Sequence, residues 1–294
     1  MRKILILFAT LSLVTPAQAQ QSGNIPAAIY TDPAPDGENP ARMEVLHIPS
    51  GEVNINAVAY IAAGEGPHPT LVLCHGWPGN EKNLDLAQAV RRAGWNVVTF
   101  NYRGSWGSPG SFRFAQNPED AKAVLAYLRD PDNAAKLAVD PAKIAVMGHS
   151  MGGWVTAMVA GEDDGLIGAG LISAGNLGLV GQMDRAFVVN TAAGNSETLA
   201  DTSPEIMADE LIASHEEFDF RRLAPGLARK PLLVLTSDDG LAAHSNELVD
   251  ATKAQGGVQI TVYHAATDHG WSDHRIDLAT QTLRWLETLV SKKE

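Results

Sequence analysis

The feature of this sequence that most constrains its fold is a regular alternation of short apolar runs with longer amphipathic stretches. The apolar runs are uninterrupted, as in strands buried on both faces of a sheet, and they cover 70–74, 97–100, 144–147, 166–172, 232–235 and 258–263. The stretches between them have apolar residues at helical spacings of three and four, and they include 83–93, 118–128, 151–160, 245–255 and 275–290. This order predicts an α/β fold with a mostly parallel sheet and helices on both faces.

Two further strands are expected ahead of these runs. Residues 43–49 and 53–63 alternate apolar and polar side chains on either side of Ser50-Gly51, which is typical of two half-buried antiparallel strands joined by a tight turn. Together with the six apolar runs they predict an eight-stranded sheet. We expect the folded domain to cover residues 43–294.

The first residues predict export. Arg2 and Lys3 precede an apolar run from Ile4 to Val14, and Ala17 and Ala19 are the small residues expected before a signal-peptidase cleavage site. The apolar run is too short to span a bilayer. We therefore expect a signal peptide over 1–19, cleavage after Ala19, and a periplasmic or secreted protein. Residues 20–42 are rich in Pro, Gly, Ala and Asp and are expected to form an extended arm.

Composition narrows the classes of partner. The chain has 22 Lys plus Arg against 34 Asp plus Glu, a formal net charge of −12. Nucleic acids and anionic membrane surfaces are bound through clustered cations, so we expect neither as a partner, and no membrane association after cleavage of the signal peptide. Hydrophobic residues make up 45% of the chain, which is enough for a sizeable core and excludes a disordered protein. With Cys74 as its single cysteine, the chain forms no internal disulfide.

One segment interrupts the alternation. Residues 176–229 lie between two expected strands and contain a polar, weakly periodic part up to 203, followed by a helix-like part from 204 to 218. Segments of this length in a compact domain are usually lids or insertions. We expect a small cap over one edge of the sheet.

The strongest chemical signal is a serine between glycines. Gly148-His149-Ser150-Met151-Gly152 follows the strand expected at 144–147 and precedes the helix expected at 151–160. A serine on such a sharp turn is raised above the sheet, and the glycines are required because side chains at those positions would collide with the neighbouring strand and helix. Ser150 is therefore the candidate nucleophile.

A second glycine-rich turn supplies a candidate oxyanion hole. It consists of Cys74-His75-Gly76-Trp77-Pro78-Gly79, at the end of an earlier strand. Acyl transfer places negative charge on the former carbonyl oxygen, and two backbone N–H groups aimed at that oxygen stabilise it. The motif assigns the N–H groups of Met151 and Trp77 to this role. We expect His75 to orient the turn.

The base and the acid are expected in the last two loops. His269 follows the last expected strand and can reach Ser150, whereas His274, five residues later, begins the C-terminal helix and is the weaker candidate. The imidazole needs a carboxylate to fix its tautomer, and Asp238 and Asp239 both follow the strand at 232–235. Asp239 is preferred because it lies at the tip of the turn, and Asp238 remains the alternative.

Other chemistries fit the sequence less well. His264, His269 and His274 are five residues apart, which does not place two metal ligands on one helix face, and no C-x-x-C is present, so no metal is expected. Gly104, Gly107 and Gly110 do not form a phosphate-binding G-x-x-x-x-G-K-[ST] motif. Two interpretations of the tryptophans near the proposed loops stay open, namely the lining of an apolar acyl pocket and packing; these are Trp77, Trp106, Trp154 and Trp271.

From these residues the chain resembles the α/β-hydrolase superfamily, in which nucleophile, acid and histidine follow one another in this order. Residues 101–112, N-Y-R-G-S-W-G-S-P-G-S-F, also resemble a loop of dienelactone-hydrolase-like and prolyl-oligopeptidase-like serine hydrolases, with one extra residue between Gly104 and Gly107. The resemblance implies an α/β-hydrolase fold and hydrolysis of an ester, amide or thioester of a small acyl substrate through an acyl-serine, without a cofactor.

A carboxylesterase-like enzyme is the first expectation for the function. Two alternatives are a serine peptidase reduced to its catalytic domain and a binding protein on a hydrolase scaffold.

Overall fold

The computed structural model describes residues 25–291 of the chain. The predicted signal peptide, 1–19, and the first residues of the predicted arm lie outside the described residues. Within residues 25–291, no helix combines the length and the apolar character needed to cross a membrane.

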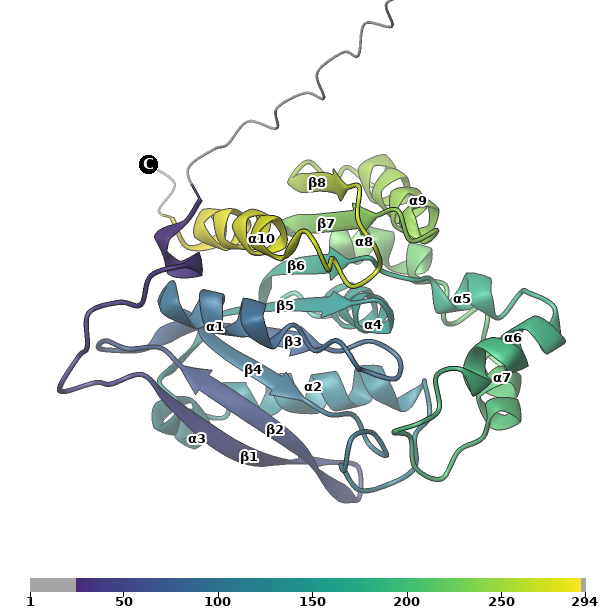
Figure 1. Cartoon of the computed structure of the whole chain (residues 1–294), viewed down its shortest axis with the longest axis horizontal. Coiled ribbons are helices and arrows are strands. Elements are labelled where there is room, and N and C mark those ends of the chain that lie inside the picture. The colour runs from purple at the N-terminus through teal and green to yellow at the C-terminus, as the bar shows by residue number, and fades with distance from the viewer. Residues whose placement is uncertain (1–24, 292–294) are drawn as a thin grey trace, which may run out of the picture.

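One eight-stranded sheet runs through the molecule in the order β1-β2-β4-β3-β5-β6-β7-β8 (Figure 1). β2 pairs antiparallel with β1 and β4, and every other neighbouring pair is parallel. The strands are β1 (Arg42–Ser50), β2 (Val53–Ile61), β3 (His68–Cys74), β4 (Asn96–Phe100), β5 (Val139–His149), β6 (Leu166–Ile172), β7 (Leu232–Ser237) and β8 (Ile260–Ala265). The predicted α/β architecture with a mostly parallel sheet is thereby confirmed.

Helices cover both faces of this sheet (Figure 1). One face packs against α1 (Leu84–Arg92) and α10 (Arg275–Val290), and the other against α2 (Gln116–Arg129), α4 (Met151–Ala160) and α9 (Ala242–Ala254). These helices agree with the predicted ones to within a few residues. The short α3 (Pro131–Lys136) was not predicted, although the Asp130 side chain caps it by accepting from Asn133 N at 3.1 Å, with Pro131 in its first turn.

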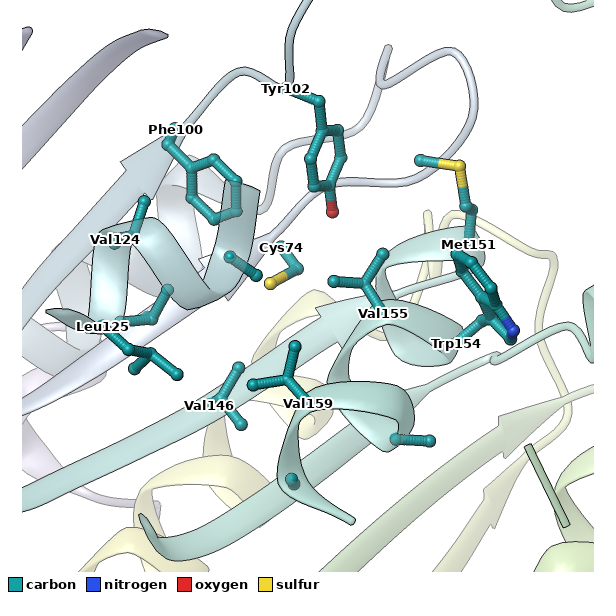
Figure 2. Packing of buried hydrophobic residues seen from close by; sticks show 14 of the residues in the cluster. Cys74, Phe100, Tyr102, Val124, Leu125, Val146, Met151, Trp154, Val155 and Val159 are labelled. Carbon is teal, nitrogen blue, oxygen red and sulfur yellow. The ribbon is translucent and has the colours of Figure 1, made fainter. Parts of the chain in front are cut away.

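Part of the hydrophobic core lies between the central strands and the helices α2 and α4. Figure 2 shows Cys74 and Val146 from the strands, Val124 from α2 and Val155 from α4 packed together. All four side chains are buried, and burial raises the pKa of the Cys74 thiol to about 12. Cys74 therefore stays protonated and acts as a packing residue.

The segment 176–229, called the insertion below, has two parts. α5 (Leu177–Val180), α6 (Arg185–Ala193) and α7 (Pro204–Ala213) lie beyond the carboxyl ends of the strands (Figure 1). η2 (Phe220–Leu223) and α8 (Ala224–Leu227) instead pack against α4 and α9, as part of the helical layer. The helix predicted from 204 ends at Ala213, and α6 lies in the part for which no helix was predicted.

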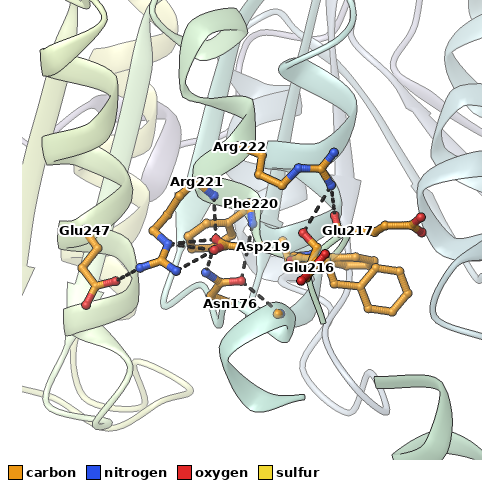
Figure 3. A network of polar contacts seen from close by, with 11 residues as sticks. Asn176, Glu216, Glu217, Asp219, Phe220, Arg221, Arg222 and Glu247 are labelled. Atoms are coloured by element: carbon orange, nitrogen blue, oxygen red, sulfur yellow. Dashed lines mark hydrogen bonds and ion pairs between the residues drawn. The ribbon is translucent and has the colours of Figure 1, made fainter. Parts of the chain in front are cut away.

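Polar contacts join the two ends of the insertion (Figure 3). Asn176 Nδ2 donates to Asp219 Oδ1 at 2.8 Å, and Asp219 Oδ2 accepts from Arg221 Nη2 at 2.6 Å. Arg221 Nη1 also donates to Glu247 Oε2 of α9 at 2.8 Å. We call this group, Asn176, Asp219, Arg221 and Glu247, the neck, because it closes the base of the part of the insertion that contains α5, α6 and α7.

The insertion is also attached at its far end, to the segment between β4 and α2. Ala200 N donates to Gly104 O at 2.7 Å, and Phe112 N donates to Ala200 O at 3.0 Å. Glu210 of α7 accepts from the N–H groups of Phe114 (3.0 Å) and Ala115 (2.8 Å) just before α2 begins. A carboxylate from a distant helix thus satisfies two backbone donors of the segment that leads into α2.

The described part of the predicted arm contacts α1 and α10. Residues Ala27–Ile29 form a 3₁₀ turn, and Arg92 of α1 donates to the carbonyl oxygens of Ala28 (2.6 Å) and Ile29 (3.0 Å). Ala28 and Ile29 also pack against the core on this face.

Candidate active site

Ser150 lies on the turn between β5 and α4. Its backbone has φ 59° and ψ −121°, a region that residues other than glycine rarely adopt. Hydrogen bonds on both sides hold this conformation, because Ser150 N donates to Ile172 O at 2.9 Å and Ser150 O accepts from Gly153 N at 3.0 Å. The strained turn presents the side chain above the sheet, at the N-terminus of α4.

The neighbouring glycines are required by close backbone approaches. A Cβ at Gly148 would lie 2.0 Å from Gly152 O, and one at Gly152 would lie 2.1 Å from Cys74 O. No side chain fits at these distances, so the turn can form only with glycine at both positions. The same approach packs α4 against the carboxyl end of β3.

The turn after β3 lies against Ser150. A Cβ at Gly76 would lie 3.0 Å from Ser150 Cβ and 3.5 Å from Ser150 Oγ. The backbone N–H groups of Trp77 and Met151 donate to no other group within residues 25–291. Two free donors beside a raised hydroxyl are the arrangement that an oxyanion hole requires, and α4 adds the positive end of its dipole.

His269 and Asp239 contact one another. His269 Nδ1 lies 2.7 Å from Asp239 Oδ2, and the side chains are 41% and 2% exposed. Burial raises the pKa of the Asp239 carboxyl, but hydrogen bonds from His269 and the Leu241 N–H outweigh this, so its pKa lies below the ordinary value. An ionised, buried carboxylate fixes Nδ1 as the protonated nitrogen and leaves Nε2 free to accept a proton.

The alternative candidates have other partners. Asp238 Oδ1 lies 3.1 Å from Nε2 of His264, and both side chains are largely exposed. His274 Nδ1 lies 2.9 Å from Asp273 Oδ1, at the start of α10. Of the two adjacent aspartates, Asp239 therefore contacts the histidine of the last loop.

Ser150 and His269 line the same pocket, of about 220 Å³. The pocket is lined by Gly76, Trp77, Pro78, Gly79, Asn80, Glu81, His149, Ser150, Asn195, His269 and Gly270. No hydrogen bond joins Ser150 Oγ to His269 in the described chain. Such catalytic hydrogen bonds are often long in the absence of substrate and shorten when substrate binds. Asn195, which follows α6, is the contribution of the insertion to this lining.

His149 is a functional candidate that the sequence reasoning did not identify. Its Nε2 lies 2.7 Å from the backbone oxygen of His269, and the two imidazole centroids are 4.6 Å apart. Burial, with the nearby His269, lowers the pKa of His149 to about 4, so the ring is neutral at pH 7. His149 thus links the serine turn to the His269 loop. Its place next to Ser150 was the only sequence signal, because its contact lies 120 residues away.

His75 has the orienting geometry expected of it. Its Nδ1 lies 2.8 Å from Gly76 O, and its ring packs edge-on against Tyr102 with centroids 4.6 Å apart. Burial lowers the pKa of His75 to about 4. A neutral ring bonded to Gly76 O holds the turn after β3 in one conformation.

The tryptophans separate into the two roles that were left open. Trp77 lines the pocket, whereas Trp154 and Trp271 are fully buried and donate to Phe218 O (2.7 Å) and Ser173 Oγ (3.0 Å). Trp106 is partly exposed and donates to Pro78 O at 2.8 Å, bracing the turn from outside. Within the described residues, no group of three or more His, Cys, Asp or Glu side chains could hold a metal ion.

Part of this amino-acid sequence is similar to the sequences of known proteins. An uncharacterized protein of Mycobacterium tuberculosis is 33% identical over 96 residues, which are 32% of this chain and 32% of that protein. The match thus spans about a third of that relative's length.

Solved structures match more of the fold. Pyrococcus horikoshii acylaminoacyl peptidase superposes with a TM-score of 0.67 at 17% identity, over 86% of this chain and 42% of that one. An esterase from Pyrobaculum calidifontis gives a TM-score of 0.63 at 21% identity, over 87% of this chain and 88% of the esterase. At these identities the likeness concerns the fold alone.

A sequence model of the alpha/beta hydrolase family matches residues 71–281, from β3 to within α10. The matched region contains the serine turn, both candidate aspartates and His269. By this match, this chain belongs to the alpha/beta hydrolase family.

Proposed function

We propose that this hydrolase is a serine hydrolase that cleaves a small ester through an acyl-serine intermediate. One observation carries the proposal: Ser150, held at positive φ, shares a pocket with His269, whose Nδ1 is bound to the buried carboxylate of Asp239. A serine hydroxyl becomes a nucleophile near neutral pH when a base lies beside it and an acid orients that base.

In the first half of the reaction, Ser150 Oγ attacks the substrate carbonyl carbon as His269 Nε2 takes the hydroxyl proton. The carbonyl oxygen becomes an oxyanion and accepts hydrogen bonds from the N–H groups of Trp77 and Met151, each worth about 3–4 kcal/mol in such sites. Asp239 stabilises the imidazolium. His269 then returns the proton to the leaving alcohol as the bond to the carbonyl carbon breaks.

In the second half, water replaces the alcohol. His269 takes a proton from the water, whose oxygen attacks the acyl carbon, and the second tetrahedral intermediate uses the same two N–H groups. The bond from the acyl carbon to Ser150 Oγ then breaks. His269 protonates Oγ, which regenerates the enzyme and releases the carboxylic acid.

The pocket favours a small substrate. Its volume of about 220 Å³ is below the roughly 300–1,000 Å³ of sites for drug-sized ligands. The insertion is attached at its neck and to the segment before α2, so it limits the pocket on that side. Short acyl groups such as acetyl are the first substrates to test.

The decisive experiment is labelling with a fluorophosphonate probe, which reacts with activated serines. We expect labelling of the native protein, loss of labelling after boiling, and none in Ser150→Ala. With p-nitrophenyl acetate, Ser150→Ala should lower kcat by about 10⁵–10⁶. Ser196→Ala, in the insertion, is the control and should label normally. Equal labelling of native protein and Ser150→Ala would refute the assignment.

We also propose that the enzyme is exported, on the basis of the signal-peptide pattern of residues 1–19. Expression in a bacterial host with N-terminal sequencing of the periplasmic and secreted fractions tests this. A mature protein beginning at Gln20 supports export, and an uncleaved protein confined to the cytoplasm contradicts it.

A further inference from the structure

We infer that the pocket selects substrates with a cationic group, such as a protonated amine or a quaternary ammonium, and that Glu81 binds this group. The inference rests on the proposed function, because it names the substrate class of the same site. Apart from the imidazoles, Glu81 is the one ionisable side chain among the described residues that line the pocket.

The carboxylate of Glu81 is held in place but not neutralised. Its Oε1 accepts from Asn83 N at 2.5 Å, which fixes the side chain along the turn before α1, and the side chain remains 40% exposed. A carboxylate with one oxygen bound to the backbone keeps its second oxygen for a ligand. A group fixed before the ligand arrives loses little conformational entropy on binding.

The nearest cation is engaged elsewhere. Arg275 Nη2 lies 3.9 Å from Glu81 Oε1, but the same guanidinium is bound to both oxygens of Asp85, with Nε 2.8 Å from Oδ2. It also donates to Gly270 O at 3.0 Å. The two carboxylates of Glu81 and Asp85 and the guanidinium of Arg275 together have a net charge of about −1.

The adjacent lysine is directed away from this pocket. Lys82 Nζ donates to Asn101 Oδ1 at 2.9 Å and lies 4.3 Å from the ring centroid of Trp106. Lys82 lines a different pocket, next to β2 and β4. Of these two neighbouring residues, Glu81 therefore lines the pocket that contains Ser150, and Lys82 lines the other pocket.

Asn195 adds a hydrogen-bond acceptor to the pocket lining. Asn195 Nδ2 donates to Thr191 O at 2.8 Å, which leaves the amide oxygen of Asn195 as an acceptor. An amine or ammonium ligand supplies positive charge to Glu81 and, where protonated, N–H donors to such acceptors. The formal net charge of −12 attracts cations to the molecule as a whole, and an anionic acyl substrate would meet repulsion.

Matched substrates test the inference. Acetylthiocholine and S-(3,3-dimethylbutyl) thioacetate share an acyl group and shape and differ in charge, and alanine p-nitroanilide with its N-acetyl derivative is the equivalent pair for a charge on the acyl side. We expect the native enzyme to favour the cationic member of at least one pair in kcat/KM. Glu81→Gln should lower this preference by about tenfold, because kcat/KM falls more for the cationic member of a pair than for its neutral partner.

The variant is chosen to preserve the fold, because the amide oxygen of Gln can still accept from Asn83 N. Glu65→Gln, at an exposed position outside the pocket lining, changes the net charge equally and should leave the preference unchanged. The preference should also fall as salt is raised. An unchanged preference in Glu81→Gln, or no preference in the native enzyme, would overturn the inference while the proposed function stands.

A second measurement covers the case in which none of these substrates is turned over. Phenyltrimethylammonium should slow fluorophosphonate labelling of Ser150 in the native enzyme and slow it about tenfold less effectively in Glu81→Gln. Labelling that is equally insensitive to the cation in both proteins would refute the role of Glu81. Absence of any labelling of Ser150 would instead refute the proposed function and, with it, this inference.

Discussion

Two aspartates, Asp239 in the candidate active site and Asp219 in the neck, are both bound by hydrogen bonds that lower the pKa of the carboxyl against the effect of burial. Their partners differ. Asp239 contacts the imidazole of His269, which lines the pocket. Asp219 contacts the guanidinium of Arg221, which also donates a hydrogen bond to Glu247. An imidazole can exchange a proton near pH 7, and a guanidinium cannot.

The partner of a hydrogen-bonded carboxylate therefore decides what the carboxylate does. The same arrangement orients a proton acceptor at the carboxyl end of the sheet and joins two chain segments at the base of the insertion. Loss of Asp239 should therefore lower activity with little change in stability, and loss of Asp219 should do the reverse.

The largest effect is expected for Asp239→Asn. Without the carboxylate, His269 takes the wrong tautomer, and kcat should fall by about 10⁴ with a small change in the free energy of unfolding. Asp238→Asn is the matched control, since Asp238 contacts His264, and it should stay within a few-fold of the native rate. Steady-state kinetics of both variants decide the point. A larger loss in Asp238→Asn would assign the acid to the other residue.

A smaller loss is expected for His149→Ala. This change removes the contact to His269 O, so the base loop loses a positioning partner, and kcat should fall by about 10–100-fold with little change in KM. His149→Gln offers an N–H in nearly the same place and should recover part of the rate. Equal loss of kcat in the Ala and Gln variants, or a loss confined to KM, would argue against positioning.

Stability should depend on pH through the histidines at the site. The pKa values of His75 and His149 are lowered by burial from 6.5 to about 4, so between these values the unfolded chain binds more protons than the folded one. The free energy of unfolding should therefore fall by about 2 kcal/mol per histidine as the pH drops from 7 to 5. His244, which accepts from Asn176 N, has a lowered pKa and adds to the loss in the same direction.

Urea unfolding at pH 7 and pH 5 measures this dependence. His149→Gln should reduce the difference between the two pH values by its share of about 2 kcal/mol, because glutamine does not titrate. A pH dependence that is identical in the native protein and the variant would show that His149 is charged in the folded state or that its site is open to water.

The smallest effect is expected at the neck. Asp219→Asn removes charge-assisted bonds to a partly exposed Arg221 and should lower the free energy of unfolding by about 1 kcal/mol, with kcat within a few-fold of native. Chemical denaturation and activity measured on the same sample test both expectations. A large loss of activity at unchanged stability would mean that the neck also positions the insertion residue Asn195 at the pocket.

Much of the fold followed from local sequence. Six apolar runs and two segments of alternating apolar and polar residues predicted the eight strands, and the glycines around Ser150 predicted the strained turn, because these features depend on neighbours within a few residues. The insertion was predicted less well. α6 was missed because its apolar residues do not follow a clear helical period, and η2 and α8 join the helical layer through packing against α4 and α9.

The sequence by itself determined the sheet, the serine turn and the order in which the candidate residues follow one another, because each is set by short-range steric and hydrophobic patterns. Only the tertiary structure decided that Asp239 contacts His269, that His149 reaches the His269 loop, and that Glu81 faces the pocket while Lys82 does not. The first two contacts join residues from different loops, and the third statement concerns two adjacent side chains that line different pockets. These positions depend on the twist of the sheet and the packing of the helices, which no local pattern encodes.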